Sequence, residues 1–238
     1  YLNNPDKDQL WFDSNCSISL HKISIMQDRI QELRKEYRKE VLDEAATHAN
    51  PIIQFKKWFQ EALDVQLNEP NAMMLATVNE HGRPSARIVL LKDITDIGIT
   101  FYTNYLSRKG KEIAGQEYAC VTFFWPELER QIRFEGKLSK VDAKISDDYF
   151  AIRPRGSQIG AWSSPQSQQI QSRAVLEENE RKFIQQFEGK PVPRPDHWGG
   201  YQLEPDYVEF WQGRENRMHD RICYSLKEAT WNRFRVAP

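Results

Sequence analysis

The middle of the chain alternates between short apolar runs and polar turn sequences. Five of these runs are strand-length and rich in β-branched and aromatic residues, which favours strands. They fall within residues 72–141 and read AMMLATV, ARIVLL, GITFYT, ACVTFFW and RQIRFEGKLSKV. NEHGRP, between the first two, is typical of a hairpin connection. Such a succession predicts a meander or an antiparallel barrel, because closure removes exposed sheet edges.

Helical spacing precedes this region. Residues 24–27, SIMQ, have the form of a capping box. The apolar positions behind them predict a helix, and Asn50 and Pro51 suit the cap and first turn of a second helix. The apolar positions of the first helix are Ile30, Leu33, Tyr37 and Val41.

Further helices and strands follow the five runs. Ser107 can cap a helix in SRKGKEIA, and Pro154 should end one in SDDYFAI. We expect an amphipathic helix at 176–187, a stiff loop in PVPRPDHWGG, and final strands in VEFW, RICYSL and RFRVA. The fold class predicted is α+β, an antiparallel barrel with surrounding helices. Residues 1–22 look irregular, and residues 23–238 are expected to form a single domain.

Composition limits the function classes. The 238 residues carry a net charge of -1, whereas a nucleic-acid-coating protein is usually basic. No apolar run approaches the ~20 residues of a membrane span, and the N-terminus lacks the pattern of a secretory signal. The chain does not begin with Met, so we expect part of its natural start to be missing. Three cysteines without a C-x-x-C pattern fit a reducing compartment, and we expect a cytoplasmic location.

The common catalytic signatures do not occur. The sequence contains no phosphate-binding P-loop, no G-x-G-x-x-G, no H-E-x-x-H and no G-x-S-x-G. The five histidines have no ligand spacing, so no metal site is expected.

Short cationic stretches remain, on predicted strand ends and loops. Each alone has an ordinary structural explanation; Arg153 and Arg155, for example, could pair with Asp147 and Asp148. Together, their forked guanidinium groups and nearby hydroxyls suit small phosphorylated ligands. Single-stranded nucleic acid is the competing hypothesis, since barrels with basic and aromatic surfaces bind it. The stretches are RIVLLK at 87–92, YTNYLSRKGK at 102–111, RQIRFEG at 130–136, YFAIRPRGSQ at 149–158 and FWQGRENRMHDR at 210–221.

These stretches carry a family resemblance. RIVLLK, FYTN…SRKGKEI, ERQIRFEG, YFAIRPRGSQIGAWSSPQS, WGGY and EFWQG…RMHDR, in this order and ending in RVAP, resemble pyridoxamine 5'-phosphate oxidase. The resemblance runs from about residue 33 to residue 238. It implies the FMN-binding split barrel, an obligate homodimer with flavin at the subunit interface and two sites that each draw residues from both chains.

The resemblance also implies the reaction. Pyridoxamine or pyridoxine 5'-phosphate is oxidised to pyridoxal 5'-phosphate by hydride transfer from C4' to flavin N5. Oxygen reoxidises the flavin and yields hydrogen peroxide, and the amine also releases ammonia. No nucleic acid or membrane partner is expected.

Matching positions imply the ligand contacts. Arg87, Arg108 and Lys109 are expected to hold the FMN phosphate, and Gln131 the edge of the ring. The full FMN set is Arg87, Ile88, Val89, Leu90, Leu91, Lys92, Tyr102, Thr103, Arg108, Lys109, Gln131, Gln166, Ser167, Trp211 and Arg221.

The substrate set divides by role. Its phosphate group is expected to meet Lys92, Tyr149, Arg153 and Ser157, and its ring Arg217 and His219, which are the candidate catalytic residues. Arg34, Lys35, Glu36 and Tyr37 match a segment that can close over the site as a lid.

Two questions stay open at this point. His219 could move a proton or only orient the substrate. In a strand, Arg217, His219 and Arg221 would share one face.

Two other functions also remain possible, namely a split-barrel flavoprotein with a different activity and a flavin-free module that binds a phosphorylated ligand or nucleic acid.

Overall fold

The computed structural model describes residue 30 and residues 36–238. Residues 38–238 form one compact unit. The predicted irregular segment, the boundary at residue 23 and the capping box at 24–27 lie outside the described residues. The elements are η1 (Glu44–Ala46), α2 (Pro51–Asp64), β1 (Ala72–Val78), β2 (Pro84–Leu90), β3 (Asp93–Ile94), β4 (Ile99–Asn104), α3 (Arg108–Gly115), β5 (Tyr118–Trp125), β6 (Arg130–Lys140), α4 (Ala143–Ala151), α5 (Arg155–Ser163), α6 (Arg173–Gln186), β7 (Trp198–Gln212), η2 (Glu215–Arg217), β8 (Asp220–Lys227) and β9 (Thr230–Arg235).

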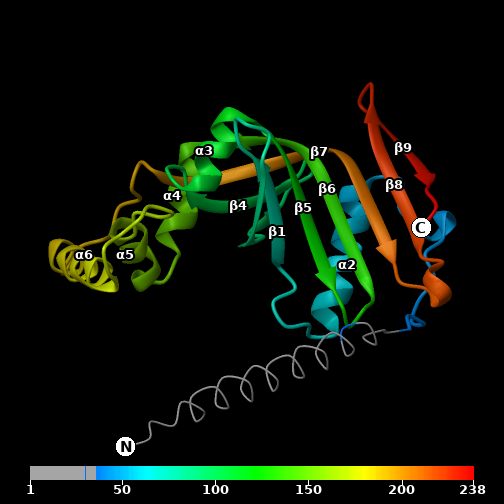
Figure 1. Cartoon of the computed structure of the whole chain (residues 1–238), viewed down its shortest axis with the longest axis horizontal. Helices are drawn as coiled ribbons and strands as arrows, with labels where there is room; N and C mark the ends of the chain where they lie inside the picture. Colours follow the sequence, from blue (N-terminus) through cyan, green and yellow to red (C-terminus); the bar gives the residue numbers. More distant parts are fainter. Residues whose placement is uncertain (1–29, 31–35) are drawn as a thin grey trace, which may run out of the picture. The chain divides into compact units, whose positions relative to one another are not determined.

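The strands form one curled antiparallel sheet (Figure 1). Its order is β2-β1-β5-β6-β7-β4-β3, with β8 also paired with β7 and β9 paired with β8. Strand β7 is the central element: its first residues pair with β4, its last residues pair with β8, and β6 runs along almost all of it. It therefore joins two separate regions of the sheet, one beside α4 and one beside α2 (Figure 1).

A bulge bends the long β6–β7 pair. The register shifts between Glu135 and Gly136. A Cβ at Gly136 would lie 2.1 Å from the Glu204 carbonyl oxygen, a separation that no side chain tolerates. Glycine is needed here because the two backbones approach each other so closely.

Helix α2 closes the inner face of the curled sheet. Phe55 is fully buried, and its ring centroid lies 5.0 Å from that of Phe123 and 4.9 Å from that of Phe134. The helix begins as predicted, because the Asn50 Oδ1 accepts a hydrogen bond from the Ile52 backbone N–H at 2.8 Å. This aromatic cluster forms the core of the unit.

The structure corrects two expectations. Tyr37 and Val41 are not helical, because backbone N–H groups of the neighbouring residues are bonded to distant carboxylates, for example Leu42 N to Asp220 Oδ2 at 3.1 Å. Residues 198–200 of the expected loop are the start of β7. The expectation that a helix in SDDYFAI ends before Pro154 is confirmed, since α4 ends at Ala151, and α5 starts directly after Pro154. No helix in the described part of the chain is long and apolar enough to cross a bilayer.

Candidate active site

A cavity of about 570 Å³ opens between β2, β4, α4 and α5. It brings together predicted residues from both ligand sets, although they come from separate elements of the chain. Its lining includes Ile88, Val89, Leu90, Lys92, Tyr102, Thr103, Lys109, Tyr149, Arg153, Ser157 and Gln166.

Planar side chains stack along one wall of this cavity. The rings of Tyr102 and Tyr149 have centroids 4.0 Å apart and planes 17° apart. Trp198 continues the stack, 5.3 Å from Tyr102, and the Arg153 guanidinium carbon lies 4.5 Å from the Trp198 ring centroid. The cation is thus held against an aromatic face, which fixes its position without neutralising it.

Arg153 lacks a partner for one of its nitrogens. Its Nη1 is buried and has no hydrogen bond within the described residues. Asp147 and Asp148, the predicted alternatives, instead bind Arg194 at 2.6 Å and Lys144 at 2.9 Å. Burial lowers the pKa of Arg153 below its ordinary value. A half-buried cation with a buried, open donor is poised for an anionic ligand oxygen.

A second cluster of cations gathers at the start of α3. Ser107 caps this helix by accepting from the Gly110 N–H. Glu112, buried beneath the cluster, binds Arg87 Nη2 at 3.1 Å and Arg108 Nε at 2.8 Å. Lys109 is buried and lines the cavity, and desolvation, followed by repulsion from Arg87, lowers its pKa. One carboxylate among three cations leaves an excess of positive charge, which suits a phosphate group.

The remaining predicted residues lie elsewhere. Gln131 pairs with Trp211 across β6–β7, and Trp211 pairs with Arg221 across β7–β8, so their side chains form a row on one face. Arg221 Nε and Arg133 Nη2 bind the buried Glu209 at 2.9 and 2.8 Å. This row is at the β8 end of β7.

The chain segment that contains Arg217 and His219 lies next to this row of side chains, but its backbone is not a strand. Residues 215–217 form η2, and both Asn216 and Arg217 have positive φ values, of 53° and 61°. The prediction that Arg217, His219 and Arg221 share a strand face is therefore wrong, because alternation requires an extended backbone. The His219 ring instead packs on Trp211, with centroids 4.6 Å apart.

The two groups of residues are far apart within one chain. Trp198 lines the cavity at the first residue of β7, and Trp211 stands thirteen residues later on the same strand. At about 3.3 Å per residue, the path between them along the strand is about 40 Å. The two groups therefore lie at opposite ends of β7.

Several predicted residues stand outside the cavity lining. Leu91 belongs to the core, and Ser167 has a positive φ of 68° in the loop after Gln166. Arg34 and Lys35 lie outside the described residues, whereas Glu36 and Tyr37 are described and are not helical. The sequence interpretation missed Glu112, whose position four residues after Arg108 in a predicted helix could have revealed it. It also missed six residues of the lining: Asn104, Pro154, Gly160, Ala161, Ser164 and Trp198.

Two family models match the chain. Residues 59–185 match the model described as Pyridoxamine 5'-phosphate oxidase. Residues 198–238 match the Pyridoxine 5'-phosphate oxidase C-terminal dimerisation region. The second match begins with β7 and includes Trp211 and Arg221 of the row, whereas Gln131 lies in the first match.

Curated relatives are similar over nearly their whole length. A pyridoxine/pyridoxamine 5'-phosphate oxidase from Cyanothece sp. (strain PCC 7425 / ATCC 29141) is 52% identical over 209 residues, covering 88% of this chain and 98% of that protein. The enzyme of the same name from Acidovorax sp. (strain JS42) is 53% identical over 215 residues, covering 90% and 99%.

Solved structures confirm the split-barrel fold. PhzG from Burkholderia lata 383, in complex with tetrahydrophenazine-1-carboxylic acid, has a TM-score of 0.80 and 27% identity, covering 86% of this chain and 100% of that chain. A pyridoxamine 5'-phosphate oxidase-related, FMN binding protein from Nostoc punctiforme PCC 73102 has a TM-score of 0.63 and 18% identity, covering 77% and 97%.

Proposed function

Because the chain belongs to the pyridoxamine 5'-phosphate oxidase family, we propose that it oxidises pyridoxamine and pyridoxine 5'-phosphates to pyridoxal 5'-phosphate. The observation that carries the proposal is the cavity in which Lys92, Lys109 and Arg153 converge beside stacked aromatic rings. Cations beside flat aromatic walls suit ligands that combine a phosphate with a planar ring.

The donor set fits FMN. The cations of the α3 cluster, Arg87, Arg108 and Lys109, would hold its phosphate. Of these three, Lys109 lines the cavity, together with Thr103 and Gln166. When bound, FMN would supply the two-electron acceptor, at N5, for a hydride from substrate C4', and O2 would be the final acceptor and would give hydrogen peroxide; with the amine substrate, water would hydrolyse the resulting imine and release ammonia.

The substrate phosphate would occupy the other end of the cavity. Lys92, Tyr149, Arg153 and Ser157 all line it, and the open Arg153 Nη1 is the donor that still needs an acceptor. Aromatic stacking around Tyr102 and Trp198 would exclude water and fix the plane of the substrate ring. Holding reacting atoms ~3–3.5 Å apart lowers a barrier by several kcal/mol.

The site would be completed by a second copy of the chain. The proposal takes five residues from the other subunit of a homodimer, because they lie on or beside the far end of β7. They are Gln131, Trp211, Arg217, His219 and Arg221. The match of residues 198–238 to a dimerisation region supports this arrangement.

Anaerobic bleaching tests the proposal. Purified protein should be yellow and should lose its colour when pyridoxamine 5'-phosphate is added without oxygen. Yellow protein that ignores this substrate would indicate a different flavin reaction, and colourless protein that takes up no FMN would indicate a flavin-free binding module. Tetrahydrophenazine-1-carboxylic acid is the comparison substrate, because the PhzG structure holds it.

A further inference from the structure

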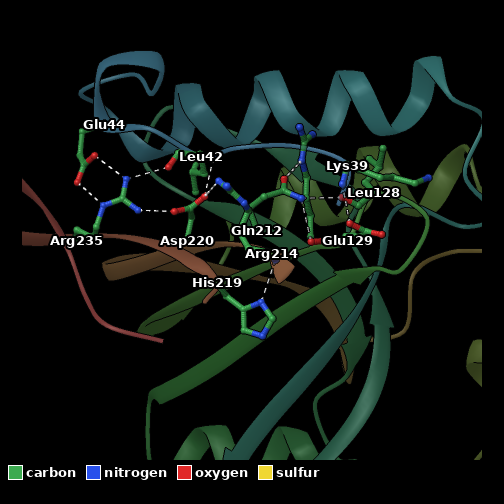
Figure 2. A network of polar contacts seen from close by, with 11 residues as sticks. Lys39, Leu42, Glu44, Leu128, Glu129, Gln212, Arg214, His219, Asp220 and Arg235 are labelled. Atoms are coloured by element: carbon green, nitrogen blue, oxygen red, sulfur yellow. Dashed lines mark hydrogen bonds and ion pairs between the residues drawn. The ribbon is translucent and has the colours of Figure 1, made fainter. Parts of the chain in front are cut away.

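The turn before β8 fixes one nitrogen of His219. The Arg214 backbone N–H donates to His219 Nδ1, with 3.1 Å between the two nitrogens. A backbone N–H can only donate, so Nδ1 must present its lone pair. In a neutral imidazole the proton is then on Nε2. Figure 2 shows this contact at the edge of a larger polar network.

That network holds the donor in place. The Arg214 side chain donates from Nη1 to Asp220 Oδ2 at 2.9 Å. Asp220 also accepts from the Leu42 backbone N–H at 3.1 Å and from Arg235 Nη1 at 2.7 Å (Figure 2). Arg235 binds Glu44 in turn. Residue 214 is thus tied by its side chain to a carboxylate that is itself tied to two other segments, which restrains its backbone N–H.

The environment keeps His219 neutral. Desolvation, followed by the charge of Arg217, lowers the pKa of His219 below its ordinary value. Desolvation opposes ionisation of Asp220, but the hydrogen bonds from Leu42, Arg214 and Arg235 outweigh it, and the pKa of Asp220 is lowered. Near neutral pH the histidine is therefore uncharged and its anchor is ionised, so the hydrogen-bond directions given above apply.

We infer that His219 donates a hydrogen bond to the substrate through Nε2–H and does not take a proton from it, with Arg214 and Asp220 as positioning residues. To act as a base at Nε2, the ring would have to carry its proton on Nδ1, directly against the Arg214 N–H. The partner atom on the substrate is then an acceptor, such as the negatively charged oxygen of the ionised hydroxyl attached to the pyridine ring. This inference rests on the proposed function for the identity of the substrate.

The tautomer can be measured directly. FMN-loaded protein labelled with ¹⁵N-histidine should show His219 protonated on Nε2 in long-range ¹H–¹⁵N correlation spectra at neutral pH, and His219→Gln identifies its signals. Protonation on Nδ1 would overturn the inference. This measurement needs no turnover, so it stands even if the protein fails to oxidise pyridoxamine 5'-phosphate.

Positioning is tested by Asp220→Asn. Loss of the carboxylate charge should loosen Arg214 and give a mixture of His219 tautomers, whereas an unchanged spectrum would refute the role of Asp220. Glu44→Gln is the matched control, because it removes a carboxylate from Arg235 but leaves the Arg214–Asp220 pair intact. It should leave the tautomer unchanged, and thermal unfolding checks that both variants are folded.

Kinetics separate donor from base. The glutamine amide N–H can replace Nε2–H, but glutamine cannot accept a proton at neutral pH. Relative to wild type, His219→Ala should lower kcat/KM for pyridoxamine 5'-phosphate by roughly 10–100-fold, the cost of losing a hydrogen bond to a charged group. His219→Gln should recover most of this loss. Equal losses in both variants would show that a base had been removed.

Discussion

The guanidinium of Arg87 and the carboxylate of Glu112 form an ion pair of 3.1 Å whose acidic partner is buried. Glu112 also accepts from the hydroxyls of Thr77 and Ser85, at 2.5 and 2.6 Å, and from Arg108. One carboxylate therefore orients two arginines that are predicted to hold a phosphate. Its role is to fix their geometry, because its own charge opposes anion binding.

Glu112→Gln should remove a pH-dependent part of the stability. Desolvation raises the pKa of this carboxyl, but hydrogen bonds from Ser85, Thr77, Arg108 and Arg87 outweigh it, and the pKa falls from 4.5 to about 2. A lowered folded-state pKa contributes stability above the unfolded value, and this is lost as pH falls from about 4.5 to about 2. We expect the variant to lose about 3 kcal/mol of unfolding free energy at pH 7.

Denaturant unfolding at a series of pH values measures this contribution. The gap between wild type and Glu112→Gln should close as pH falls through the window. Glu177→Gln is the control, since Glu177 also pairs with an arginine four residues away, Arg173, but on the surface. It should change the unfolding free energy by less than about 1 kcal/mol. A constant gap at every pH would contradict the assignment.

Arg108→Ala should affect FMN more than substrate. The side chain is 61% exposed and its ion pair with Glu112 is partly solvated, so the effect on stability should be small. We expect the Kd for FMN to rise roughly tenfold, as for loss of a charged hydrogen bond, while the KM for pyridoxamine 5'-phosphate changes little. FMN titration by fluorescence and steady-state kinetics give the two values.

Lys111→Ala is the control for this experiment. It removes a positive charge from an exposed position of the same helix. If it weakens FMN binding as much as Arg108→Ala does, the effect is one of general charge. If Arg108→Ala weakens FMN and substrate equally, the two phosphate positions have been assigned wrongly.

Local patterns predicted the strands well, but they wrongly extended the N-terminal helix to Tyr37 and Val41. The strand at residues 72–78 was indicated by a short apolar run that ends in a turn sequence, and such a run is a local property of the chain. At Arg38 and Lys39, by contrast, the backbone N–H groups both donate to Glu129 Oε2, at 2.9 and 3.1 Å. The spacing of apolar residues around Arg38 cannot reveal a hydrogen-bond partner some ninety positions away. These tertiary hydrogen bonds therefore overrode the helical pattern.

The site could be predicted as a set of residue types but not as an arrangement. Basic and hydroxyl residues indicated phosphate, and the structure brings Lys92, Arg153 and Ser157 to one cavity. The separation of Trp211 from Trp198 depends on the length of β7, whose first residues looked like loop because of two glycines. The turn at 215–217 depends on positive φ values. Asparagine tolerates such a φ, but its presence in the sequence does not predict one.

Arg153→Met should weaken substrate binding without destabilising the protein. The variant keeps an unbranched, mostly apolar side chain but removes the guanidinium group and its charge, so the KM for pyridoxamine 5'-phosphate should rise roughly 10–100-fold. Burial of the unpartnered Nη1 is unfavourable, whereas the contact with Trp198 is favourable. These effects oppose each other, and we expect the unfolding free energy to change by less than about 1 kcal/mol.

Arg155→Met provides the comparison. Arg155 donates to the carbonyl oxygens of Lys190 and Phe187, at 3.0 and 2.6 Å, and does not line the cavity. It should lose stability while KM stays at the wild-type value. The opposite pattern, a KM effect at Arg155 and none at Arg153, would place the phosphate elsewhere.

Arg217→Lys tests whether shape matters at this position beyond charge. Both residues meet the same backbone cost at a φ of 61°, so the turn should fold equally well. Lysine lacks the planar fork that stacks on a ring and donates twice, and we expect kcat/KM for pyridoxamine 5'-phosphate to fall roughly 10–100-fold with FMN affinity unchanged. Arg83→Lys, in the exposed β1–β2 turn, is the matched control and should be neutral. Stopped-flow reduction of the flavin isolates the affected step, and wild-type kinetics in Arg217→Lys would exclude a role for the guanidinium plane.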